Sequence, residues 1–443
     1  MLNSPADYEV RHLSIKDLWH NVNYSSRDIV FYRLKVLIHL CRSLAAMWRL
    51  GFFFHEIAFG LLSVFIPLYV VTPAIGGSLV DLGIMTSAAL LFAIPASFFW
   101  GYICDRTRRY KRYILLSFMS ATVLLYLFTL ATNVTVFIIL YVIMTILHVA
   151  HEAPKNILVA EHYSREDWGK SYALYEGFTE IGWLIGLLMG LFASTIALSP
   201  AHILLLCSGL NLVAFVLSIF LVADPLLIFE RRLVNIEKKI DYTYRGVKIV
   251  SRLMGGLSLR EKFRSENFFA FGMGLTLFSL ATSLFFTPLP IFFSKELAFP
   301  TNMVFLVYML SSGGAVAGYF LAGKSATSPN AKSYMQQIVL LRSALVFALV
   351  AIINFAVSTT LLASVILVFM GFAYAFYYIL TLSLSMELIS TGRTGLFDAL
   401  VGLGASIGSF LGPFLAEMLG FLPQFMIAGV IFFSAYLVLR IFS

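Results

Sequence analysis

Apolar stretches of about twenty residues recur along nearly the whole chain, and short polar segments separate them. A helix of about twenty residues crosses a hydrocarbon core of roughly 30 Å. Inside lipid, a helix also satisfies its backbone polar groups within its own segment. The pattern therefore predicts an all-α polytopic membrane protein. The predicted spans number twelve and cover residues 46–72, 80–104, 112–131, 134–160, 171–196, 201–223, 268–292, 301–323, 335–356, 359–389, 395–418 and 421–442.

The segment before the first span has a different pattern. Residues 1–27 are polar, and residues 28–49 combine an apolar stripe with Arg33, Lys35 and Arg42. We expect residues 1–45 to be a cytoplasmic segment that contains a basic helix at the membrane surface. No small-residue cleavage pattern follows the first span, so we expect that span to stay in the mature protein.

The positions of lysine and arginine predict the orientation, because cytoplasmic flanks retain these residues. With an even number of spans, both termini lie on one side of the membrane. Of the 31 lysine and arginine residues, 29 fall in or beside segments of that side, and the exceptions are Lys295 and Arg342. We therefore expect a plasma (inner) membrane protein with both termini in the cytoplasm, and we expect Arg342 to snorkel toward that side.

Composition agrees with a membrane protein and disfavours other classes. The chain has 443 residues, of which 60% are hydrophobic and 12% are charged, whereas a soluble domain has about a quarter charged residues. The net charge of +8 reflects cytoplasmic loops, so we expect no nucleic-acid partner. The three cysteines show no metal-ligand spacing. No nucleotide loop or nucleophile–base pair is present, so we expect no enzyme, no ATP-driven pump, no cofactor and no metal.

The two halves of the chain resemble each other in sequence. Residues 65–69 correspond to residues 286–290, and an offset of 226 pairs several glycines and glutamates of the two halves. We therefore expect two six-helix bundles with pseudo-twofold symmetry. The expected domains are an N-terminal bundle at 46–223, a cytoplasmic linker at 224–267 and a C-terminal bundle at 268–443.

Two rows of glycine recur every fourth residue, in the fifth and the eleventh span. Such a row leaves a bare backbone stripe that lets a neighbouring helix approach closely in lipid. We expect helix packing at these rows, and an alternative is that they are the surfaces along which the two halves rock. The rows are Gly182, Gly186 and Gly190, and Gly404, Gly408 and Gly412.

The loop after the second span contains Gly101, Asp105, Arg106 and Arg109 in the pattern G-x-x-x-D-R-x-x-R. In a protein of six plus six spans, this pattern resembles the loop signature of the major facilitator superfamily. The chain departs from the usual signature at Arg108, where a second glycine is common. A competing interpretation is that these cations only anchor a short cytoplasmic loop.

The resemblance implies alternating access, with spans 1, 4, 7 and 10 around a central cavity. It implies that Gly101 allows close packing of spans 2 and 11, and that Asp105 lies near the positive end of span 11. It also implies that Arg109 pairs with Glu161, so that these contacts close the cytoplasmic side. Span 5 lacks the Gly-Pro pair of the superfamily's antiporter signature, which disfavours drug–proton exchange.

Ionisable residues inside the spans are the candidate functional groups, because charge in the membrane is costly and usually marks a pathway or a partnered site. Four of them in span 4 share one helical face. Others in spans 1 and 5 lie at a similar depth, and an aromatic face of span 10 occupies the position equivalent to span 4. The resemblance implies that these two faces line the central cavity and hold the substrate between them. The residues are His148, His151, Glu152 and Lys155 in span 4, His55, Glu56, Glu176 and Glu180 in spans 1 and 5, and Tyr374, Tyr377 and Tyr378 in span 10.

From these features we predict a secondary active transporter that moves a small polar or amphipathic solute by alternating access, with proton coupling at a histidine or glutamate. The alternatives are an uncoupled facilitator and a transport-inactive receptor or scaffold. Structural hydrogen bonds between the histidines, or an ion pair of Glu152 with Lys155, would explain the same residues. A metal site made by two histidines and two glutamates lacks diagnostic spacing. The expected partners are a small-molecule substrate, protons and the lipid bilayer, and the protein is expected to be a monomer.

Overall fold

The structure is a computed structural model, and it describes residues 47–162, 168–224, 268–325, 328, 330–355, 359–388 and 395–442. Secondary structure in these ranges is helical. Twelve of the described helical segments are long and apolar enough to cross a membrane, and they coincide with the predicted spans. The predicted surface helix before residue 46 and the linker at 225–267 lie outside the described residues.

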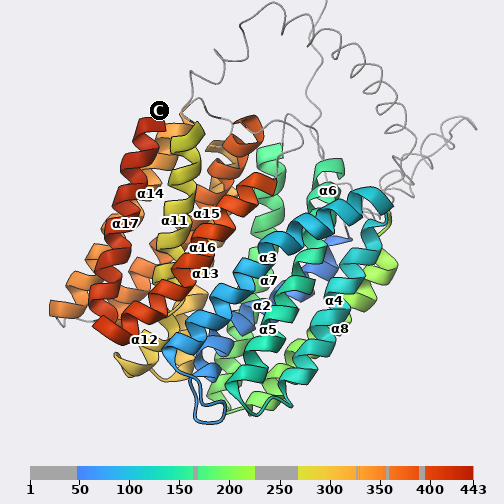
Figure 1. The fold of residues 1–443 in the computed structure, drawn as a ribbon, viewed down its shortest axis with the longest axis horizontal. Helices are drawn as coiled ribbons and strands as arrows, with labels where there is room; N and C mark the ends of the chain where they lie inside the picture. Colours follow the sequence, from blue (N-terminus) through green and yellow to red (C-terminus); the bar gives the residue numbers. More distant parts are fainter. Residues whose placement is uncertain are drawn as a thin grey trace, which may run out of the picture. The chain divides into compact units, whose positions relative to one another are not determined.

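The N-terminal half consists of the helices from α2 to α8 (Figure 1). Within it, α2 packs against α7 and α8, and α4 packs against α8 and α5. The fourth span is not one continuous α-helix, because a short 3₁₀ turn, η2, interrupts it. The bounds are α2 (Arg49–Val70), α3 (Leu79–Thr107), α4 (Tyr110–Phe128), α5 (Val134–His148), η2 (Val149–His151), α6 (Glu152–His162), α7 (Trp168–Thr195) and α8 (Pro200–Leu221).

The C-terminal half consists of the helices from α11 to α17. Here α13 packs against α15, and α11 packs against α16 and α17. The seventh span is composed of α11 and α12, and Pro288 stands at the break between them. The bounds are α11 (Phe268–Phe286), α12 (Leu289–Lys295), α13 (Thr301–Ser325), α14 (Ala331–Phe355), α15 (Thr359–Leu388), α16 (Gly395–Leu419) and α17 (Phe421–Phe442).

The glycine rows bring helices together within each half. A Cβ atom on Gly182 would lie 2.8 Å from the carbonyl oxygen of Phe53 in α2, and one on Gly186 would overlap the carbonyl of Ile57. In the C-terminal half, a Cβ on Gly404, Gly408 or Gly412 would overlap the carbonyls of Thr276, Leu280 and Leu284 in α11. The α2–α7 and α11–α16 pairs are therefore equivalent close contacts, as expected from the internal duplication.

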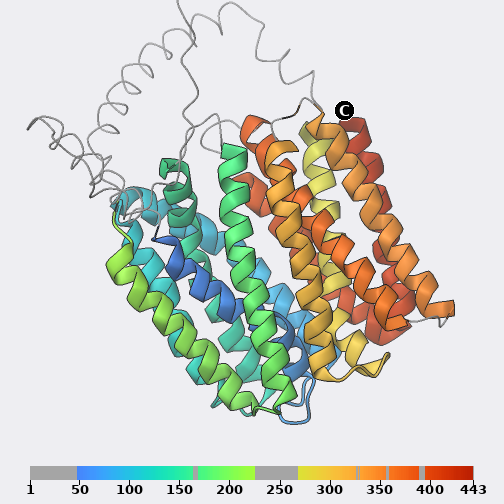
Figure 2. The ribbon, with the colours of Figure 1, turned by 180° about the vertical axis from the view of Figure 1, so that it is seen from behind.

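The two halves meet along two helix pairs, α3 with α16 and α7 with α13 (Figures 1 and 2). Along the first pair, the backbone N–H of Val80 donates to Glu417 at 3.0 Å, and the Ser406 hydroxyl donates to the carbonyl of Ser87 at 3.0 Å. Along the second pair, a Cβ on Gly190 would overlap the ring of Phe305. The alternative that the glycine rows form the rocking surfaces is therefore wrong except at Gly190, since the other five glycines of the rows pack within their own half.

The contact that the loop signature implied at Gly101 is not among the contacts of the described residues, which exclude residues 389–394 directly before span 11. A Cβ on Gly101 would have no described atom within 4 Å, whereas Ile94, two turns earlier on α3, lies 3.0 Å from the Cβ position of Gly402 on α16. The hydrogen bonds between α3 and α16 in the described residues lie closer to Val80, at the opposite end of α3. The described contacts between α3 and α16 thus reach from Val80 to Ile94, and the packing of the loop signature remains a prediction.

One test of this architecture is the substitution Gly408→Ala. The added methyl group would overlap the Leu280 carbonyl, so we expect a loss of about 1–3 kcal/mol in stability from overpacking. The measurement is thermal unfolding of the protein in detergent. Gly209→Ala on α8 is the matched control, because a Cβ there has no atom within 4 Å, and alanine should be neutral or improve helix propensity by up to about 1 kcal/mol. Equal effects in both variants would contradict the assigned contact.

Candidate functional site

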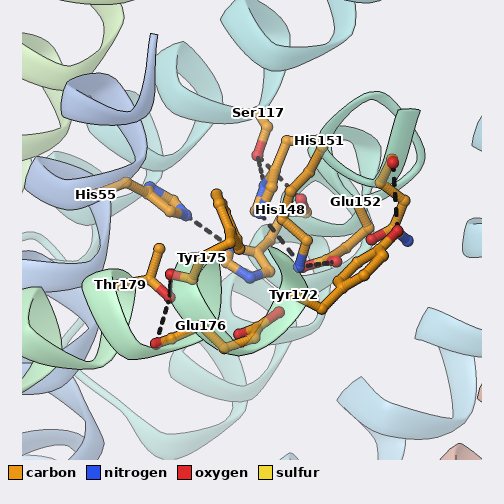
Figure 3. Close-up of polar contacts among 11 residues, drawn as sticks. His55, Ser117, His148, His151, Glu152, Tyr172, Tyr175, Glu176 and Thr179 are labelled. Carbon is orange, nitrogen blue, oxygen red and sulfur yellow. Dashed lines mark hydrogen bonds and ion pairs between the residues drawn. The ribbon is translucent and has the colours of Figure 1, made fainter. Parts of the chain in front are cut away.

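The candidate site lies in the N-terminal half, at the break of the fourth span (Figure 3). Pro154 lacks a backbone N–H and cannot donate to the carbonyl of residue 150, so the preceding turn tightens into η2. Side chains three residues apart eclipse in a 3₁₀ turn. Accordingly, His148 and His151 lie together, with ring centroids 4.7 Å apart. The uniform α-helix expected for this span is wrong at this point.

His55 of α2 completes a cluster of three histidines. Its Nε2 lies 3.1 Å from Nδ1 of His148, and its Nδ1 lies 2.6 Å from Oδ1 of Asn211 on α8. The amide nitrogen of Asn211 donates to the carbonyl of Cys207 at 2.9 Å, which fixes the oxygen toward the histidine. His55 therefore donates its Nδ1–H to Asn211 and presents Nε2 to the cluster.

His151 is oriented in the same way by Ser117 of α4. The Ser117 hydroxyl donates to the carbonyl of His148 at 3.0 Å, so it accepts from Nδ1–H of His151, also at 3.0 Å. The other ring nitrogen of His151 lies 3.3 Å from Oε1 of Glu152. His55 and His151 are 0% and 1% exposed. These two histidines thus point into the N-terminal half, and the expectation that they face the central cavity is wrong.

The carboxylates of the site gather around one lysine. Glu152 forms an ion pair with Lys155, and the ammonium group of Lys155 lies 5.9 Å from the centre of the Tyr175 ring. The ion pair of Glu152 with Lys155 that one alternative supposed is therefore present, and the Lys155 side chain is largely buried. Glu56 of α2 is within electrostatic reach of Lys155, Glu152, Glu176 and Glu180. Spans 1, 4 and 5 therefore do bring their ionisable residues together.

Glu180 connects the two halves. Its Oε1 accepts a hydrogen bond of 2.6 Å from the Ser312 hydroxyl on α13. Glu176 lies one turn earlier on α7, where its backbone carbonyl accepts from Thr179 at 3.0 Å (Figure 3). Glu180 is thus the sequence-predicted carboxylate with a direct hydrogen bond across the interface between the halves.

The tyrosines of span 10 divide between two faces of α15. Tyr374 is 39% exposed and stacks with Tyr378 at a centroid distance of 6.2 Å, and it interacts electrostatically with Glu176 and Glu180. Tyr377 instead is buried and stacks on Phe278 of α11 at 3.5 Å. The prediction that Tyr377 faces the central cavity is therefore wrong, because residues 374 and 378 share a face that residue 377 does not.

Arg342 in the middle of α14 is fully buried, so the snorkelling expected for it is wrong. Its three guanidinium nitrogens have no hydrogen-bond partner among the described residues. Aromatic rings surround the group instead, with centroids 5.0–5.5 Å from Cζ. The rings belong to Phe278 and Phe286 of α11, Tyr374 of α15 and Phe432 of α17. Cation–π attraction is thus the interaction that compensates this buried charge.

The loop signature lies between α3 and α4. Arg106 donates to the Tyr102 hydroxyl at 3.2 Å, and Arg109 is the residue before the first turn of α4. Arg108 ends α3 with a φ of 54°, a left-handed conformation that favours glycine. The side chain of Glu161 lies outside the described residues. Its pairing with Arg109, and the place of Asp105 beside span 11, therefore remain predictions.

Comparison with known proteins supplies the family. The model of the Major Facilitator Superfamily matches residues 50–396. The chain belongs to this superfamily. It is an integral, multi-pass membrane protein of a family of transporters.

Curated members of the superfamily match part of the chain. It is 31% identical to "Multidrug resistance protein MdtG" of Serratia proteamaculans over 192 residues, which are 42% of this chain and 46% of that relative. It is 28% identical to the protein of the same name from Rahnella sp. over 218 residues, which are 47% of this chain and 50% of that relative. The chain thus matches about half the length of these superfamily members.

Solved structures of superfamily members have the same fold. The human organic anion transporter MFSD10 (TETRAN) has a TM-score of 0.63 at 14% identity, covering 90% of this chain and 99% of that one. The nucleoside transporter NupG has a TM-score of 0.62 at 14% identity, with coverage of 90% and 98%. At this identity, the likeness establishes the superfamily fold and not the substrate.

Several residues of this superfamily member were not among the sequence-based candidates. Asn211 could have been found, because an amide in the middle of an otherwise apolar span needs a buried partner. Ser117 and Ser312 gave no such signal, since serine is common in membrane helices. Arg342 was expected to reach the membrane surface. The sequence position of Arg342 could not show that aromatic rings surround it instead of carboxylates.

The aromatic cage of Arg342 can be tested by comparing Arg342→Lys with Arg342→Met. An ammonium group is more strongly hydrated than a guanidinium group and stacks less well on rings. We expect Arg342→Lys to lower stability by about 2 kcal/mol or more, because burying an ion costs several kcal/mol. Arg342→Met, which removes the charge, should cost less. Thermal unfolding in detergent measures both, with the exposed Arg440→Met at the end of α17 as control. A larger loss of stability in Arg342→Met than in Arg342→Lys would contradict the aromatic cage as the main partner of the charge.

Proposed function

We propose that the protein is a secondary active transporter that moves a polar or amphipathic solute by alternating access and couples this movement to protons. Membership of the superfamily supports transport, and the contacts of α3 with α16 and of α7 with α13 supply the seams along which two halves can exchange conformations. We further propose that it works in the plasma (inner) membrane with both termini in the cytoplasm, as the distribution of lysine and arginine supports.

The glutamates of the N-terminal half favour a cationic amphipathic solute. Besides Glu152, which pairs with Lys155, the cluster contains three further carboxyl groups, those of Glu56, Glu176 and Glu180. The facing α15 offers the stacked rings of Tyr374 and Tyr378. Carboxylates and aromatic faces together attract organic cations. The curated relatives are named multidrug resistance proteins, which agrees with this chemistry, although the Gly-Pro antiporter signature is absent from span 5.

The observation that supports proton coupling is the hydrogen bond between Glu180 and Ser312. An ionised carboxylate only accepts hydrogen bonds, whereas a protonated one can also donate and has lost its charge. Protonation of Glu180 therefore changes a contact between α7 and α13, which belong to opposite halves. A proton bound here would shift the balance between conformations in which this contact is made and broken.

Four other titratable groups face Glu180 and would act on its protonation. Glu176 lies on the same helix, Glu56 on α2, Tyr319 on α13 and Tyr374 on α15. The two glutamates disfavour a further negative charge, so a cationic solute and a proton would compete for the same cluster. Competition of this kind is sufficient for exchange of the solute against protons.

The test is transport of tetraphenylphosphonium, an amphipathic cation, in proteoliposomes that contain a pH-sensitive dye. In the wild type, an imposed pH gradient should drive the cation, and the cation should drive proton flux. Glu180→Gln can keep a hydrogen bond to Ser312 but cannot titrate, so proton-coupled flux should fall to background while exchange of labelled for unlabelled cation continues. Glu296→Gln, at an exposed carboxylate after α12, should behave as the wild type.

Two outcomes would replace this proposal with the alternatives. Movement of the cation without proton flux in the wild type would identify an uncoupled facilitator. No movement of the cation or of a pooled metabolite and drug library, in a wild-type preparation that unfolds cooperatively, would favour a receptor or scaffold on the same fold. Full proton coupling in Glu180→Gln would exclude this residue as the proton site and leave the transporter itself intact.

A further inference from the structure

We propose that His55, His148 and His151 form a binding site for a divalent transition-metal ion, with Zn²⁺ as the ion that fits best. The ligand atoms would be Nε2 of His55, Nδ1 of His148 and Nε2 of His151. They come from α2, from the end of α5 and from η2. The carboxylate of Glu152, at the start of α6, lies 3.3 Å from Nε2 of His151, and this carboxylate or a water molecule would be the fourth ligand. This inference is independent of what the protein transports.

The distances between the donor atoms agree with a tetrahedral ion. One ligand atom from each histidine lies within 4.8 Å of the other two. Bonds of about 2.0–2.1 Å to a tetrahedral zinc ion separate neighbouring ligand atoms by roughly 3.3 Å. His55 Nε2 is 3.1 Å from His148 Nδ1, and His151 Nε2 is 3.3 Å from Glu152 Oε1. Both separations match the edge of a tetrahedral site, and the group whose ligand atoms all lie within 4.8 Å of one another consists of the three histidines.

The hydrogen bonds behind the rings hold the lone pairs of two histidines toward the common centre. Asn211 accepts from Nδ1–H of His55, and Ser117 accepts from Nδ1–H of His151. Metal-binding histidines in proteins use the second ring nitrogen in this way, as a donor to an oxygen that fixes the ring. His148 offers Nδ1 once the proton shared with His55 moves to its Nε2 or leaves. The cluster therefore has both the ligands and their supporting shell.

The donor set selects the class of ion. Imidazole nitrogens suit Zn²⁺, Cu²⁺, Ni²⁺ and Co²⁺, whereas Mg²⁺ and Ca²⁺ require oxygen ligands. Three neutral imidazoles and one carboxylate would partly neutralise a divalent ion in a buried position. Glu152 can serve both neighbours, because Oε2 contacts Lys155 while Oε1 points to His151. Its side chain is 36% exposed, which gives the ion a route from the surface to the buried rings.

The absence of a sequence motif is explained by the fold. One ligand precedes the 3₁₀ turn of the fourth span, a second is the last residue of that turn, and the third lies 93 residues before His148 on another helix. Local spacing could not reveal such a site. A bound ion would tie α2 to the broken fourth span, so it would stabilise the N-terminal half, and the gain would grow with the logarithm of the ratio of ion concentration to Kd.

The experiment uses the full chain in detergent, stripped of metal with a chelator. After incubation with Zn²⁺ and removal of free ion, elemental analysis should find one zinc per chain. Co²⁺ should give the intense visible absorption of a tetrahedral site, and Zn²⁺ should remove that signal. Zn²⁺ should also raise the unfolding temperature of the wild type, whereas Mg²⁺ should not.

His148→Gln is the main variant, because His148 is only partly buried and glutamine keeps a hydrogen-bonding side chain of similar length. We expect Zn²⁺ affinity to fall at least about a hundredfold, the upper end of the losses seen when a supporting residue is removed. Asn211→Ala should lower it about 10–100-fold. His202→Gln is the matched control, since that histidine is exposed on α8 and bonded to Ser199, and it should bind zinc as the wild type does.

Three results would overturn the site. They are substoichiometric zinc in the wild type, an octahedral cobalt spectrum, or equal zinc uptake by the wild type and His148→Gln. The metal-free unfolding temperature of each variant shows whether that variant is folded. If a variant does not fold, the cobalt spectrum of the wild type still shows whether a tetrahedral metal site exists. Binding is measured without transport, so failure here leaves the proposed transport function in place, and failure of transport leaves the metal site in place.

Discussion

The constraint on which this structure depends is that lipid offers no partner to a polar group. Every backbone amide in the spans must therefore be satisfied by the protein itself. Where the backbone departs from a regular α-helix, at η2, Pro154 has removed one donor, and the Ser117 hydroxyl donates to the carbonyl of His148. The same constraint explains the pairing of Glu152 with Lys155 and the aromatic rings around Arg342.

Close packing within a half and adaptable packing between halves follow from different chemistry. Inside each half, glycines of α7 and α16 let backbone meet backbone, and such contacts have one geometry only. Between the halves, the contacts include hydrogen bonds of hydroxyl and carboxylate groups, such as Ser87 with Ser406 and Glu180 with Ser312, beside the packing of Gly190 on Phe305. Hydrogen bonds of this kind can be exchanged for water or for another partner at little net cost. Two firm units joined by exchangeable contacts suit a protein that alternates between conformations.

The sequence predicted the helices, the duplication and the presence of an ionisable cluster, because each depends on periodicity or composition that is local to one span. It failed where the answer depends on which helix lies opposite. His55 was assigned to the cavity, yet its partner is Asn211 on α8. Tyr377 was grouped with Tyr374, yet α11 covers it through Phe278.

The aromatic cage has a mechanical consequence for the C-terminal half. The four rings around Arg342 come from α11, α15 and α17, while the arginine belongs to α14. If α14 slid or turned against any of these helices, the guanidinium group would enter an apolar environment without compensation. Sliding or turning of these four helices against one another is therefore disfavoured by a single buried charge. This favours motion of the four helices together, as a rigid body.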